Sequence, residues 1–109
     1  MQGLAALFSF LFSFAIAVSS TMAQQAGDPG AGAPYAKQYC SKCHAIGETE
    51  TSPEPKAPRF KDVAKTPGMI APVLDVWLRR PHLYMPNIFV EADQIDNVIA
   101  YILSLKKSQ

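Results

Sequence analysis

The sequence has 109 residues and a nearly even charge balance, with ten Lys and Arg against nine Asp and Glu. This balance excludes the strongly basic surface that nucleic-acid-binding domains carry, so no nucleic acid is expected as a partner. The length suits one small domain, which needs a disulfide, a metal or a bound group to supplement its core.

An apolar run fills residues 4–18, and small residues follow it as far as Ala23. The run fits the central part of a secretory signal peptide better than a membrane span, which needs about 20 residues. We expect cleavage between Ala23 and Gln24, giving a signal peptide over residues 1–23 and a mature domain over residues 24–109. No Lys or Arg precedes the run, so an uncleaved N-terminal anchor is the alternative.

The first predicted helix of the mature domain precedes the two cysteines of the sequence. Asp28 and Pro29 match an N-cap and a first helical residue. Pro34 argues against a helix that begins there, because an interior proline removes a hydrogen bond and crowds the preceding turn. We therefore expect the helix to begin near Ala33 and to run to about Lys42. A helix that begins at the earlier proline and kinks at the later one is the alternative.

Two loops and two helical segments follow. Residues 45–58 are rich in Pro, Gly, Ser and Thr and are predicted to form a loop. Residues 60–64 allow one short helical stretch. Apolar residues at the i, i+3, i+4, i+7, i+8 spacing predict a helix from Ile70 to about Arg80, where a proline ends it. Residues 81–90 are predicted to form a second loop.

The last helix has the clearest pattern. The charges at its two ends match the helix dipole, because Asp93 and Asp96 lie near its start and two lysines lie at its end. Glu91 and Gln94 occupy the positions of a capping box. One apolar stripe comprises Ile95, Val98, Ile99, Ile102 and Leu103. Since no β pattern or repeat is visible, the predicted fold class is all-α.

The residues with distinctive chemistry are Cys40, Cys43 and His44, which form a Cys-x-x-Cys-His pentapeptide after the first helix. This pattern is typical of c-type haem attachment. Residues three apart share a helical face, so each cysteine can form a thioether to one haem vinyl group, and the histidine can bind the iron. A redox cysteine pair would follow a buried β-strand, and a zinc site would need a fourth ligand, for which only His82 is an obvious candidate. The motif therefore predicts one covalent haem c.

Met85 is the predicted second axial ligand of the iron. The only other methionine of the mature domain, Met69, begins a helix whose apolar face needs filling, so core packing is expected for it. Met85 precedes Pro86, which favours an extended backbone on a loop that can reach over the haem. His82 on the same loop is the rival ligand, and an open sixth position is a third possibility.

These motifs, in this order, resemble those of class I bacterial c-type cytochromes, which are small monohaem proteins with His and Met ligands. The resemblance covers essentially the whole mature domain and implies a small cytochrome c fold, with three to four helices wrapped around one haem. The matching segments are Gly32, Tyr35, residues 40–47, residues 57–60, Met85-Pro86 and residues 95–102.

The resemblance also implies roles for residues around the haem. Gly32 should allow the first helix to approach the last helix closely, near Tyr101. The carbonyl of Pro58 should accept a hydrogen bond from the ring nitrogen of His44 that does not face the iron. Trp77 and one of the two arginines that follow it should contact haem propionates, with simple core packing of the tryptophan as the alternative.

The expected function is that of a periplasmic carrier of single electrons between redox protein partners, a monomer without stable membrane insertion once the signal is removed. We expect no enzymatic activity, because no plausible acid–base pair is visible. Residues 56–80 hold six basic against two acidic residues, an excess of four charges that could steer an acidic partner. The alternatives are a dedicated cytochrome subunit of a periplasmic dehydrogenase or oxidase, a haem-based sensor or peroxidase with an open iron position, and a protein with a non-haem cysteine pair.

Overall fold

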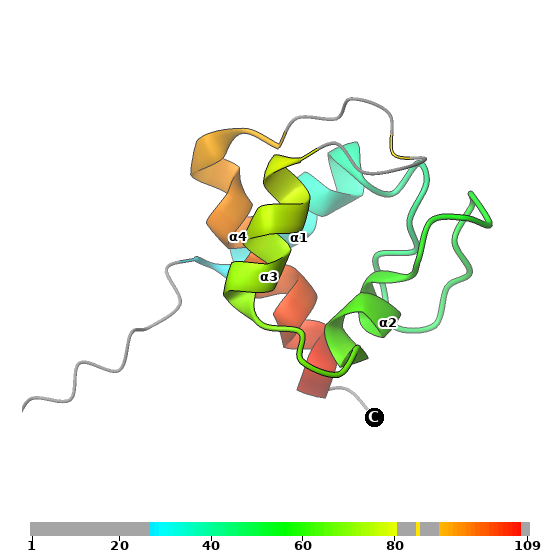
Figure 1. Ribbon diagram of the computed structural model, residues 1–109. Helices are drawn as coiled ribbons and strands as arrows, with labels where there is room; N and C mark the ends of the chain where they lie inside the picture. Colours follow the sequence, from blue (N-terminus) through cyan, green and yellow to red (C-terminus); the bar gives the residue numbers. More distant parts are fainter. Residues whose placement is uncertain (1–26, 81–84, 86–89, 108–109) are drawn as a thin grey trace, which may run out of the picture.

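The computed structural model describes residues 27–80, Met85 and residues 90–107. The predicted signal peptide and His82 lie outside these residues. Within this part of the chain the regular elements are α1 (Pro29–Tyr39), α2 (Phe60–Lys65), α3 (Ala71–Arg79), α4 (Ala92–Ser104) and the 3-10 helix η1 (Leu105–Lys107). Figure 1 shows the four α-helices. The described residues contain no strand, which confirms the all-α prediction. None of their helices is long and apolar enough to cross a membrane.

Helix α1 begins at Pro29, and the predicted start near Ala33 was wrong. The side chain of Asp28 caps the helix by accepting a hydrogen bond from the Gly30 amide at 2.8 Å. Pro29 takes the first helical position, where a missing N–H costs nothing. Pro34 lies inside the helix and removes one backbone hydrogen bond. The N-terminal cap and the packing of α1 on α4 outweigh that loss.

Helices α1 and α4 approach each other closely at Gly32, as predicted. A Cβ atom on Gly32 would lie 2.0 Å from the carbonyl oxygen of Asn97 and 2.8 Å from the Cβ of Tyr101. The start of α1 is also tied to α4, because the Asp28 amide donates a hydrogen bond to Asn97 Oδ1 at 2.9 Å. The absence of a side chain at Gly32 therefore sets the separation of the two helices.

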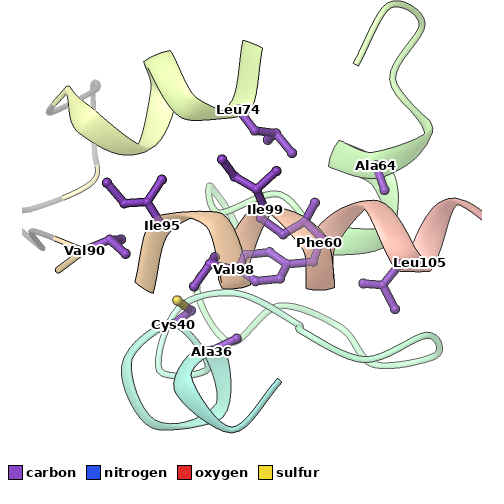
Figure 2. Close-up of a cluster of buried hydrophobic side chains, with 11 residues drawn as sticks. Ala36, Cys40, Phe60, Ala64, Leu74, Val90, Ile95, Val98, Ile99 and Leu105 are labelled. Carbon is purple, nitrogen blue, oxygen red and sulfur yellow. The ribbon is translucent and has the colours of Figure 1, made fainter. Parts of the chain in front are cut away.

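Helix α4 forms the centre of the core and contacts each of the other three helices. Four residues of its predicted stripe are buried, while Leu103 is half-buried. Figure 2 shows Ile95, Val98 and Ile99 of this stripe in one cluster with Leu74 of α3, Phe60 of α2 and Ala36 of α1. The predicted capping box is not formed, because the Glu91 side chain makes no capping hydrogen bond.

Helix α3 matches its predicted bounds to within one residue at each end. Its predicted apolar face is only partly buried, however. Leu74 is 3% exposed, whereas Ile70 and Trp77 are 54% and 53% exposed. The apolar face of α3 is not fully covered by the other helices, and part of it borders the pocket described next.

Candidate functional site

The pentapeptide forms a turn that continues directly from α1. Cys40 is the C-cap residue of the helix, and its amide donates to the Ala36 carbonyl at 2.8 Å. The amides of Cys43 and His44 both donate to the Cys40 carbonyl, at 3.2 Å and 2.9 Å. These bonds wind the motif into a tight turn, which keeps both sulfur-bearing residues and the histidine within one short stretch of backbone.

The two cysteines have different surroundings. Cys40 belongs to the buried core and is 7% exposed, while Cys43 is half-buried. Burial raises the pKa of the Cys40 thiol to about 11. The free thiol of Cys40 is therefore protonated at neutral pH.

The ring of His44 is oriented by a hydrogen bond and by an aromatic neighbour. Its Nδ1 atom lies 2.6 Å from the carbonyl oxygen of Pro58, as expected from the resemblance. Since a carbonyl can only accept a hydrogen bond, Nδ1 carries the proton and Nε2 of the neutral ring keeps its lone pair. The Phe60 ring packs against the imidazole with centroids 5.2 Å apart. His44 therefore presents Nε2 as the nitrogen that can bind a metal.

A hydrogen bond from α4 holds the backbone just after the motif. The hydroxyl of Tyr101 donates to the Ile46 carbonyl at 2.6 Å, across 55 residues of sequence. Burial, followed by the negative charges of Glu50 and Glu48, raises the pKa of Tyr101. The phenol therefore stays protonated, and remains a hydrogen-bond donor, over the whole neutral range.

An apolar pocket of about 320 Å³ lies beside the turn. Cys40, His44 and Met85 all border it, so the pocket brings together residues from the first turn and the second predicted loop. Its other lining residues are Pro58, Phe60, Asp62, Val63, Thr66, Met69, Leu74, Trp77, Leu78, Val90 and Ile102. Most of these side chains are apolar, which suits a large hydrophobic group more than a polar substrate.

Most of the predicted site residues meet at this pocket. Pro58 and Trp77 border it together with Cys40, His44 and Met85, whereas Cys43 lies on the turn outside the lining. The arginines predicted to contact propionates do not border it.

Sequence reasoning missed several lining residues. It assigned Met69 to the core, but this half-buried residue also borders the pocket. It gave no role to Thr66 or Val90, which complete the lining. Only the assembled fold brings these positions to the pocket, so no local motif could have marked them.

The donor set fits a covalently held haem. Cys40, an imidazole with a free Nε2 and a thioether border an apolar pocket, and Cys43 lies on the same turn as Cys40. These are the groups that attach and ligate haem c. Among the described residues, no cluster of three or more His, Cys, Asp or Glu side chains is arranged to hold a metal ion on its own.

Comparison with known proteins agrees with this chemistry. The chain is similar to cytochrome c-552 of Bradyrhizobium diazoefficiens, with 34% identity over 88 residues that cover 81% of this chain and 85% of that protein. No protein-family model matches the chain. No solved structure matches it.

Proposed function

We propose that this chain, which belongs to the class I c-type cytochromes, is a periplasmic electron carrier whose haem iron is ligated by His44 and Met85. Its family establishes a small cytochrome c fold, one covalently attached haem c and electron exchange with redox protein partners. The haem, when bound, supplies one-electron chemistry at its iron. The observation that carries the proposed ligation is that His44 and Met85 border one apolar pocket together with Cys40.

Each site residue has a distinct proposed task. Cys40 and Cys43 hold the haem covalently, and His44 binds the iron through Nε2. The Pro58 carbonyl fixes the imidazole orientation through the 2.6 Å hydrogen bond to Nδ1. Met85 would supply a thioether, which raises the reduction potential relative to a second imidazole.

An electron carrier needs an iron whose surroundings change little between its two oxidation states. With His44 and Met85 both bound to the iron, no position would be left for a substrate. Trp77 borders the same pocket and is proposed to cover part of the haem. Transfer then requires only brief contact with a partner, which is why we propose a carrier rather than an enzyme.

Charge over residues 56–80 supports an acidic partner. The two acidic residues of this segment form exposed ion pairs, Arg59 with Asp62 at 2.8 Å and Arg79 with Asp75 at 2.9 Å. The segment as a whole still carries an excess of four positive charges, because it has six basic residues against these two acids. Such a surface raises the rate of encounter with an acidic protein and loses its effect at high salt.

The proposed location rests on the apolar run of residues 4–18, read as a signal peptide. The expected mature protein is a monomer over residues 24–109 that is released from the membrane. Intact mass of the exported protein tests this directly, since cleavage leaves that chain plus one haem. A retained N-terminal segment would instead indicate a membrane anchor.

A second candidate function is that of a dedicated subunit of one periplasmic dehydrogenase or oxidase. The observation that favours it is the exposure of apolar residues on and beside α3, where Ile70 and Val76 are 54% and 53% exposed. A permanent partner would bury such side chains in a larger and more apolar interface. Stable co-purification with one enzyme would favour this candidate over a diffusing carrier.

Carbon monoxide tests whether the iron has a coordination position that is open to a small ligand. We expect the ferrous wild-type holoprotein to show no spectral change on mixing with the gas, because His44 and Met85 would both be bound to the iron. Met85→Ala should bind it rapidly, since the substitution opens one position. Rapid binding by the wild type would refute the carrier assignment and favour a ligand sensor or peroxidase.

A further inference from the structure

We propose that Ser52 is a positioning residue for the iron ligand His44. Its hydroxyl holds the backbone that follows the histidine, and so maintains the hydrogen bond between Nδ1 and the Pro58 carbonyl. The inference rests on the proposed ligand role of His44 and adds a residue that sets the electron-donating strength of that ligand.

The contact itself is specific and protected. The amide of Ala45, the residue after His44, donates to Ser52 Oγ at 3.0 Å. Ala45 is 1% exposed, so water has little access to this amide. Removing the hydroxyl would leave a buried donor without its partner, which proteins tolerate poorly. The backbone at Ala45 would therefore have to shift to find another acceptor.

Two neighbouring hydrogen bonds connect the ligand turn to the loop that supplies Pro58. The Glu54 amide donates to the Cys43 carbonyl at 3.1 Å, and the Phe60 amide donates to the Ala45 carbonyl at 2.9 Å. Pro58 lies in the chain between these two anchors. The position of its carbonyl relative to the histidine thus depends on how the turn and the loop are joined.

Ser52 adds a third connection of the same kind, and its partner Ala45 is shared with one of the other two. A shift of Ala45 would move the peptide that carries His44 relative to the loop. The distance between Nδ1 and the Pro58 oxygen, 2.6 Å in the intact arrangement, would then lengthen. The Ser52 hydroxyl thus controls the length of the hydrogen bond between His44 and Pro58, although it contacts neither atom of that bond.

The chemical consequence has a definite sign. A strong hydrogen bond from Nδ1 makes the imidazole a better electron donor, and this favours the more positively charged ferric iron. Lengthening the bond weakens that donation and favours the ferrous state. Loss of the Ser52 hydroxyl should therefore raise the midpoint potential.

The test compares Ser52→Ala with wild-type holoprotein and two controls. Ser52→Thr keeps a hydroxyl at the same position. Ser104→Ala removes a serine hydroxyl that donates to the Tyr101 carbonyl at 2.5 Å on the exposed side of α4. The measurements are the midpoint potential, the NMR signal of the His44 Nδ1 proton in the ferrous protein, and hydrogen exchange at the Ala45 amide.

We expect Ser52→Ala to raise the ratio of ferrous to ferric protein about threefold at the wild-type midpoint, which is about 28 mV for a one-electron couple. The Nδ1 proton signal should shift and the Ala45 amide should exchange faster. Ser52→Thr should restore all three properties, and Ser104→Ala should leave them unchanged.

The outcomes separate the inference from the proposed function. If Ala45 exchange accelerates while the potential and the Nδ1 signal stay at wild-type values, Ser52 is only structural and the inference is wrong. A potential that shifts equally in Ser104→Ala would also overturn it, because general destabilisation would then suffice. If the wild-type ferric protein shows no haem-shifted His44 ring signals, the ligand assignment itself fails, and the inference fails with it.

Discussion

Replacing Gly32 by alanine tests the packing of the N-terminal part of α1 on α4. The new Cβ would lie 2.0 Å from the Asn97 carbonyl oxygen, 2.6 Å from its carbonyl carbon and 2.8 Å from the Tyr101 Cβ. Non-bonded heavy atoms pack at about 3.5 Å, so the helices must separate by about 1.5 Å. None of the three atoms belongs to the end of a flexible side chain, so rotamer changes cannot relieve the clash.

The expected cost follows from this geometry. Overpacked cores lose about 1–3 kcal/mol, and a clash against backbone belongs at the upper end of that range or above it. The higher helix propensity of alanine offsets about 1 kcal/mol of this loss in stability. We therefore expect Gly32→Ala to lower the free energy of unfolding by about 2 kcal/mol or more.

Gly30→Ala is the matched control, because it makes the same change in the same helix. Its Cβ would meet only the Asp28 side chain, at 3.2 Å or more. We expect this control to differ from wild type by no more than about 1 kcal/mol. Denaturant unfolding of both ferric holoproteins, followed by circular dichroism, measures the difference. Equal stabilities of the two variants would refute the close α1–α4 contact.

Three further changes have expected outcomes. Asp28→Ala removes the α1 cap and should cost about 1 kcal/mol in denaturant unfolding, which Asp28→Ser should largely restore. Tyr101→Phe should cost about 1 kcal/mol through the lost bond to Ile46. Because the folded pKa of this tyrosine is raised, its contribution is complete below pH about 10 and is lost as pH rises through the folded pKa. The stability difference between wild type and Tyr101→Phe should accordingly shrink above pH 10, and a constant difference would contradict this. Lys65 lies in the basic segment 56–80, whereas Lys37 lies in α1, outside that segment. Lys65→Glu should therefore slow oxidation of the haem by the hexacyanoferrate anion more than Lys37→Glu does, although the two substitutions change the net charge equally.

The sequence predicted the elements whose signals are local and repeated. The α4 stripe recurs through the whole helix, so its position and its buried face followed from periodicity alone. The start of α1 was misjudged because two local rules conflicted, the cap at Asp28 and the interior Pro34. Packing against α4 decided between them, and that packing is not visible in a short window of sequence.

The candidate site was predictable where a motif names its own chemistry. The pentapeptide and the Met-Pro pair indicated Cys40, His44 and Met85, and the fold places all three on one pocket. Ser52 carried no such signal, because a serine in a proline-rich loop resembles any other turn residue. Its hydrogen bond to Ala45 arises only once the loop folds back on the turn.

The partial exposure of α3 was equally hidden from the sequence. Trp77 and Ile70 share the spacing of buried helical residues, yet both are more than half exposed. Periodicity reports which residues share a face, and it does not report whether that face meets protein, a bound group or solvent.

The ferric absorption spectrum of the holoprotein, compared between Met85→Leu and Met69→Leu, tests the proposed ligation most directly. Both substitutions conserve volume, and both residues border the same pocket. We predict a low-spin spectrum with a weak iron–thioether band that persists in Met69→Leu and disappears in Met85→Leu. This ligation would be contradicted if the wild-type spectrum lacked the band and the Met85→Leu spectrum were also low-spin. That result would indicate His82 as the ligand.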